Sequence, residues 1–144
     1  MKSKLIPSLL LGAVFAAATF SPALAHETPT APADWLAKEN IYTEDDIDKA
    51  FLKKAKKLYK RKCKKCHGPK GDGKGSAAAD LEIKPPPFNA PGYMADRKDG
   101  QFFWIMMEGS KGTDMEAYGP GTDVNLSEEQ LWQLISYMRS AFTK

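Results

Sequence analysis

The sequence Cys63-Lys64-Lys65-Cys66-His67 constrains this chain more than any other feature. It has the form C-x-x-C-H, the attachment sequence for a c-type haem. Each thiol can form a thioether with one vinyl group of the porphyrin, and the adjacent histidine can ligate the iron from the proximal side. The chain has only these two cysteines. We therefore predict one covalently bound haem c, held by Cys63 and Cys66 and ligated by His67.

Two other chemistries use a C-x-x-C pair, and both fit this sequence less well. A thioredoxin-like redox site belongs to a βαβ pattern, which the sequence lacks. A structural zinc site needs four ligands. The two cysteines and His67 supply three of them, and His26 is the only other histidine. The haem interpretation therefore ranks first.

The first 25 residues have the pattern of a secretory signal peptide. Lys2 and Lys4 precede an apolar run over residues 5–20, and residues 23–25 form the small-residue cleavage pattern Ala-Leu-Ala. The apolar run contains Pro7 and is shorter than the roughly 20 residues that span a bilayer. We therefore predict export to the periplasm, where c-type haem is attached, and no stable membrane insertion after cleavage.

Charge is distributed unevenly along the chain. Residues 26–48 carry seven carboxylates and one lysine, whereas residues 49–74 carry twelve lysines or arginines and one aspartate. The basic block straddles the haem-attachment sequence, so it would steer an acidic protein partner toward the haem. A solvated helix face is the alternative interpretation of the same lysines. Nucleic acid is not expected as a partner of an exported protein.

Two helices are predicted before residue 110. One begins near Thr43, where Asp46 lies at capping-box spacing, and runs directly into Cys63. The other spans residues 99–108 and ends at Gly109. Both carry apolar residues at helical spacing, so each has a face that can pack against a cofactor or another helix.

The helix near the C-terminus has the clearest start. Ser127 is its N-cap, and Gln130 stands three positions later. Its buried stripe is formed by Leu131, Leu134, Ile135 and Met138. No segment is predicted to be a strand. We therefore predict an all-α fold, with three to five helices wrapped around one covalently attached haem.

The chain divides into three predicted segments. Residues 1–25 are the signal peptide, residues 26–42 a Pro- and Ala-rich extension, and residues 43–144 a single monohaem domain. The extension contains Trp35 and Leu36. Either these two residues pin it to the domain or it is disordered.

The iron needs a second axial ligand, and methionine is the available type. Methionines in predicted helices are more often core filler than ligands, and these are Met106, Met107 and Met138. Met94 and Met115 lie in predicted loops, so both are candidates. Met115 stands in a glycine-bounded loop, where the backbone can bend a side chain toward a flat cofactor.

Over roughly residues 50–142 the chain resembles the class I c-type cytochromes, which are small soluble monohaem proteins of bacterial periplasms. The first matching residues are Ala55-x-x-Leu58-Tyr59, the haem-attachment sequence, the glycine-rich residues 71–75 and Lys84-Pro85. The later ones are Asp99-Gly100, Gly112-Thr113-Asp114-Met115, Leu126-Ser127 and Trp132-x-x-Ile135-x-Tyr137-x-Arg139. The order and spacing of these residues are more specific than the haem motif alone.

This resemblance implies a ligand set. The methionine of the family's G-T-x-M segment is the distal ligand, which corresponds to Met115. The family usually has proline after this methionine, where this chain has Glu116. In the family the proximal histidine donates its second ring nitrogen to a backbone carbonyl. One of the three prolines at positions 85–87 would supply that carbonyl, unless these prolines only keep the loop extended.

Together these features predict a periplasmic electron carrier, a monomer that is not an enzyme and that docks on acidic surfaces of protein redox partners. A fixed haem subunit of a larger periplasmic oxidoreductase is one alternative, with the acidic residues 27–48 as its interaction arm. A labile methionine ligand would instead give a gas- or peroxide-binding haem protein. No distal histidine or arginine is evident to assist O–O cleavage, which counts against catalysis.

Overall fold

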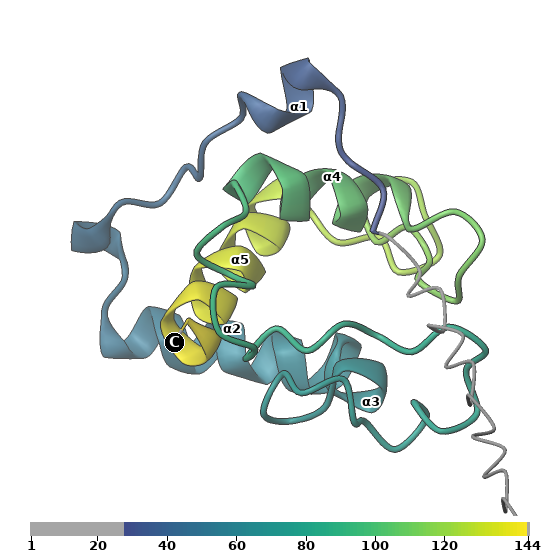
Figure 1. Ribbon diagram of the computed structural model, residues 1–144. Helices are drawn as coiled ribbons and strands as arrows, with labels where there is room; N and C mark the ends of the chain where they lie inside the picture. The colour runs from purple at the N-terminus through teal and green to yellow at the C-terminus, as the bar shows by residue number, and fades with distance from the viewer. Residues whose placement is uncertain (1–27, 144) are drawn as a thin grey trace, which may run out of the picture.

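The computed structural model describes residues 28–143, so the predicted signal peptide lies outside the described residues. Within this range the chain forms five α-helices, one 3₁₀ turn and no strand (Figure 1). The elements are α1 Ala33–Leu36, the 3₁₀ turn η1 Glu44–Asp46, α2 Lys49–Lys62, α3 Lys64–His67, α4 Asp99–Glu108 and α5 Glu128–Phe142. Between residues 28 and 143 no helix has the length and apolar character needed to cross a membrane.

Helix α5 is the central packing element, in contact with α2 on one side and α4 on the other (Figure 1). The predicted capping box at its start is confirmed, because the side chains of Ser127 and Gln130 each bond the backbone N–H of the other. The predicted stripe is also confirmed: each of its four side chains is at most 1% exposed, namely Leu131, Leu134, Ile135 and Met138.

Helix α4 has the predicted bounds, and its end has a local cause. Gly109 adopts a φ of 75°, the left-handed conformation that glycine accepts without steric cost. Phe103 of α4 stacks on Trp132 of α5 with ring centroids 4.0 Å apart and an interplanar angle of 3°. This pair of large buried rings fixes α4 against α5.

Helix α2 begins at Lys49 rather than near Thr43, so the predicted start is wrong. Thr43 and Asp46 do form the expected capping box, but it closes only the 3₁₀ turn η1. Ile47 then leaves the helical region, with a φ of −95° and a ψ of 68°. Asp48 becomes the N-cap of α2, because its carboxylate accepts a backbone N–H of the first turn at 2.7 Å.

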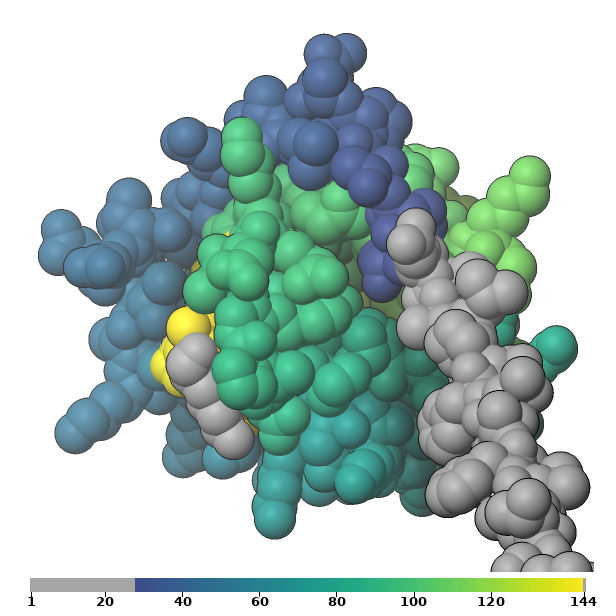
Figure 2. Space-filling model, viewed as in Figure 1, coloured from purple at the N-terminus to yellow at the C-terminus, as the bar shows by residue number. Residues whose placement is uncertain are grey.

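Residues 28–42, which we call the N-terminal strap, run over the outside of α4 before the chain turns toward α2 (Figures 1 and 2). Gln101 of α4 holds the beginning of the strap. Its Oε1 accepts a hydrogen bond from the Ala31 N–H at 2.8 Å, and its Nε2 donates to the Pro29 carbonyl at 2.9 Å. Both groups of this buried amide are therefore paired with strap backbone.

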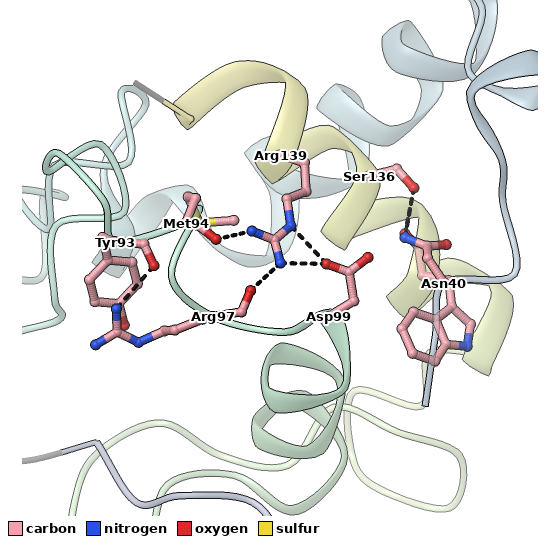
Figure 3. Close-up of polar contacts among 8 residues, drawn as sticks. Asn40, Tyr93, Met94, Arg97, Asp99, Ser136 and Arg139 are labelled. Carbon is pink, nitrogen blue, oxygen red and sulfur yellow. Dashed lines mark hydrogen bonds and ion pairs between the residues drawn. The ribbon is translucent and has the colours of Figure 1, made fainter. Parts of the chain in front are cut away.

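The middle and end of the strap are held by side chains. Trp35 of α1 packs against Phe103 with ring centroids 5.8 Å apart. Further along, the Asn40 amide donates to the Ser136 hydroxyl of α5 at 3.1 Å (Figure 3). Of the two alternatives for this segment, packing against the helices is therefore the one observed for residues 28–42. The division of the chain at residue 43 stays a prediction.

Candidate functional site

A cavity of about 690 Å³ lies between α3, α4, α5 and the loops that join them. Its lining includes the three residues of the attachment motif and the predicted distal ligand: Cys63, Cys66, His67 and Met115. Cofactor sites are typically concave and largely apolar, with volumes of about 300–1,000 Å³. The cavity therefore has the size and the side chains that a haem c requires.

The attachment motif is one additional helical turn at the end of α2. The His67 N–H donates to the Cys63 carbonyl at 2.9 Å, so both cysteines and the histidine belong to the same turn. Tyr59 of α2 is 1% exposed, and its hydroxyl donates to the Gly68 carbonyl at 2.8 Å. This buried bond anchors the residue that ends the turn and so keeps His67 at the cavity.

The glycine-rich loop folds back onto this turn. The Gly73 N–H donates to the His67 carbonyl at 3.0 Å, and the Gly75 N–H donates to the Cys66 carbonyl at 3.1 Å. A Cβ on Gly75 would overlap the Lys65 carbonyl oxygen. Glycine is therefore required here because the backbone of the loop touches the backbone of the motif.

Burial sets the protonation of the motif side chains. Desolvation lowers the pKa of His67 to about 4, so its imidazole is neutral at neutral pH. Neutral imidazole is the form that binds a metal. Desolvation also raises the pKa of Cys63 to about 12, so before haem attachment this sulfur is a thiol.

Met115 lies in a loop that is tied to both sides of the cavity. Its carbonyl accepts the Ser110 N–H at 2.8 Å, and its own N–H donates to the Thr113 hydroxyl at 3.1 Å. Three residues on, the Tyr118 hydroxyl donates to the Lys62 carbonyl at 3.3 Å, next to the attachment motif. These bonds hold the backbone of Met115 in a defined position relative to Cys63.

The other methionines occupy different positions. Met106 and Met138 also line the cavity, but from α4 and α5 as buried core residues. Met94 is 1% exposed, and it is absent from the lining formed by residues 28–143. Its side chain belongs to the hydrophobic core.

Of the two alternatives for the prolines at positions 85–87, a hydrogen bond from His67 to one of their carbonyls is not seen among the described residues. The Nδ1 atom of His67 is buried and has no hydrogen-bond partner among residues 28–143. Its ring instead stacks on Phe88, with centroids 4.5 Å apart and an interplanar angle of 19°. Sequence reasoning missed Phe88, because no local pattern marks the residue after three prolines as a neighbour of His67.

Charged residues on the cavity wall favour a cofactor with acidic groups. Three cations and two carboxylates stand on the described lining: Lys62, Lys84, Arg97, Glu82 and Asp114. Arg97 lies over the Tyr93 ring, 3.9 Å from its centroid, and donates to the Tyr93 carbonyl at 3.0 Å. A guanidinium held in this way can pair with a carboxylate such as a haem propionate.

The sequence of residues 52–142 matches the profile of the family described as Cytochrome c. The match covers more than half of the chain, so this chain belongs to the cytochrome c family. The family carries covalently bound haem c and serves haem-based electron transfer. No curated protein sequence matches this chain.

Solved structures have the same fold. A chain of the Kuenenia stuttgartiensis reducing HAO-like protein complex Kustc0457/Kustc0458 is similar, with a TM-score of 0.54 and 27% identity over 67% of this chain and 46% of that one. Cytochrome cL from Methylophaga aminisulfidivorans has a TM-score of 0.51 and 22% identity, over 72% of this chain and 61% of its own. The KustC0563 c-type cytochrome has a TM-score of 0.51 and 24% identity, over 62% of this chain and 98% of its own.

This chain spans less than two thirds of the first two of these structures. The likeness confirms the predicted all-α cytochrome c fold, and the family match confirms the identification as a cytochrome c.

Proposed function

We propose that this chain is a periplasmic electron carrier whose haem is attached through Cys63 and Cys66 and ligated by His67 and Met115. The observation that carries the proposal is that all four side chains line one cavity. A haem held by these four residues would supply one-electron chemistry between Fe(III) and Fe(II). Two strong axial ligands leave no open position for a substrate, which favours a carrier over an enzyme.

Two observations favour Met115 over Met94 as the distal ligand: its position on the cavity lining and the hydrogen bonds that hold its loop. Met115 is on the cavity lining, and its backbone is tethered to Ser110 and Thr113. Met94 is packed in the core instead. A thioether ligand raises the reduction potential, so this ligand pair makes the iron an electron acceptor for moderately reducing partners.

The chain supplies the surroundings that a carrier needs. Apolar side chains from α5 line the cavity and exclude water from it: Leu131, Leu134 and Met138. A dry and closely packed site limits the rearrangement that accompanies a change of charge on the iron. The neutral imidazole of His67 needs no deprotonation before it ligates the iron.

We further propose that the protein works as a monomer with protein redox partners that carry an acidic docking surface. Lys64 and Lys65 stand between the two cysteines and are exposed. Basic residues of the preceding helix α2 are exposed as well, among them Lys56, Lys57, Lys60 and Arg61. Such a surface raises the encounter rate with an acidic partner and does not require tight binding.

A second candidate is a fixed haem subunit of a larger periplasmic oxidoreductase. It is favoured by the similarity to a chain that belongs to a protein complex. The two candidates differ in solution: a carrier elutes alone at the mass of one chain plus one haem, whereas a subunit copurifies with a partner in equal amounts.

The test is carbon monoxide binding to the purified reduced protein, followed by its visible spectrum. An unchanged spectrum supports firm occupancy of both axial positions and hence the carrier. Rapid and complete binding would mean an open or labile sixth position, and the gas- or peroxide-binding alternative would then replace the carrier. A Cys63→Ser, Cys66→Ser variant should lose covalently bound haem in a denaturing mass measurement.

A further inference from the structure

The loop between α4 and α5, residues 109–127, carries Met115; we call it the distal loop. Its backbone lies against the end of α4, because a Cβ on Gly109 would overlap the Met115 carbonyl oxygen, 2.7 Å away. The Ser110 N–H donates to the same carbonyl at 2.8 Å. Met115 is therefore held from the α4 side of the cavity, whereas the attachment motif belongs to the end of α2 (Figure 1).

Tyr118 joins the distal loop to the attachment motif. Its hydroxyl donates to the Lys62 carbonyl at 3.3 Å, and among residues 28–143 this is the only hydrogen bond from the distal loop to α2 or α3. The carbonyl is available because α2 ends at Lys62 and the Cys66 N–H donates to the Cys63 carbonyl at 3.2 Å. A side chain of the loop thus caps the backbone directly before the first cysteine.

The backbone of Tyr118 is fixed at the same time. Its N–H donates to the Met106 carbonyl of α4 at 2.8 Å, and its carbonyl accepts the Leu126 N–H at 2.9 Å, close to the start of α5. Its ring packs against the hydrophobic core and lines the cavity. Tyr118 therefore links the elements on both sides of the cavity, three residues after Met115.

We propose that Tyr118 is a positioning residue for the distal ligand: its hydroxyl fixes the distal loop to the end of α2 and so limits how readily Met115 leaves the axial position. This inference rests on the proposed role of Met115. The other hydrogen bonds of the loop are internal or run to α4 and α5, so none of them ties it to the attachment motif. A movement of the loop away from the motif has to break the bond to Lys62.

The experiment compares two variants of the haem-loaded protein with the wild type. Tyr118→Phe keeps the ring on the cavity wall and removes only the hydroxyl. Ser136→Ala is the matched control, since it also removes a single hydroxyl, which accepts from Asn40 at 3.1 Å. Ser136 is 3% exposed and does not belong to the cavity lining that the structure describes.

Two rates report the opening of the loop. The first is the limiting rate at which saturating imidazole binds the ferric protein, followed by loss of the sulfur-to-iron charge-transfer band. The second is amide hydrogen exchange at Ser110 and Tyr118, whose N–H groups hold the loop to itself and to α4. The melting temperature is measured beside them as a readout of stability alone.

Tyr118→Phe should raise both rates about two- to tenfold, the range that corresponds to the loss of one hydrogen bond. Ser136→Ala should lower the melting temperature and leave both rates unchanged. Rates in Tyr118→Phe equal to those of the wild type would overturn the inference. So would an equal acceleration in Ser136→Ala, because the effect would then follow from general destabilisation.

The wild type separates failure of this inference from failure of the proposed function. If the ferric wild type lacks the charge-transfer band, no methionine ligates the iron, and the proposed ligand set fails together with the inference. If the band is present and Tyr118→Phe leaves both rates unchanged, the proposed ligand set stands and only the role of Tyr118 is wrong.

Discussion

Arg139 Nε donates a hydrogen bond to Asp99 Oδ1 at 2.7 Å, joining α5 to the first residue of α4 (Figure 3). The same guanidinium also donates to the carbonyls of Met94 and Arg97. The two charged side chains are 27% and 22% exposed. Arg139 of α5 therefore fixes the segment that precedes α4, residues 94–98, against α5. This segment includes Arg97, which lines the cavity.

Replacement of this arginine by lysine should be costly although the charge is kept. Arg139→Lys cannot supply the planar set of donors to one carboxylate and two carbonyls. We expect it to lower the free energy of unfolding of the haem-loaded protein by about 2–3 kcal/mol, measured by denaturant titration. Arg61→Lys on the exposed face of α2 should change it by less than about 0.5 kcal/mol. Equal effects of the two changes would contradict this role of Arg139.

The strap approaches α4 so closely that one glycine is required. A Cβ on Gly100 would overlap the carbonyl oxygen of Trp35. Gly100→Ala should therefore destabilise the protein by about 2 kcal/mol despite the better helix propensity of alanine. It should also make residues 28–42 more sensitive to limited proteolysis.

Gly112→Ala is the comparison, because nothing lies within 4 Å of its added Cβ and only its φ of 80° opposes the change. We expect a cost of about 1 kcal/mol there and no change in the proteolysis of the strap. Unaltered cleavage in Gly100→Ala would show that the strap is held without this contact.

The basic surface should control the rate of electron exchange. Lys64→Glu, Lys65→Glu should lower the second-order rate constant with an acidic redox protein by about tenfold or more at low salt. The difference should shrink as ionic strength rises, because added salt screens exposed charges. Stopped-flow measurement over a salt series tests this.

Lys49→Glu, Lys53→Glu provides the matched control for that experiment. It makes the same change of net charge at the start of α2, about 15–20 Å from the attachment motif along the helix. Its effect on the rate should be several-fold smaller. Equal effects would mean that only net charge matters and that no docking surface surrounds the haem-attachment sequence.

Elements with local signals could be predicted from the sequence. Helices α4 and α5 occur where the sequence predicts them. Gly109, with its positive φ, ends α4, and the capping box of Ser127 and Gln130 begins α5. The start of α2 was misplaced because Thr43 and Asp48 both satisfy the local rules for an N-cap, and the backbone of Ile47 decides between them.

Long-range contacts explain what the sequence could not reveal. Asn40 contacts Ser136 and Pro29 contacts Gln101, pairs that are 96 and 72 residues apart in the sequence, so no local periodicity predicts the course of the strap. In the site, Cys63 and Cys66 stand in a recognisable motif. The stack of His67 on Phe88 depends on how the proline-rich loop folds back, which local propensity does not determine.

The central claim, ligation by His67 and Met115, is tested most directly by carbon monoxide titration of two reduced variants. Met115→Ala should bind carbon monoxide rapidly and lose the sulfur-to-iron charge-transfer band of the ferric spectrum. Met94→Leu, which keeps the core filled, should bind none and keep the band. The reverse pattern would assign the distal position to Met94, and binding by neither variant would contradict methionine ligation from either loop.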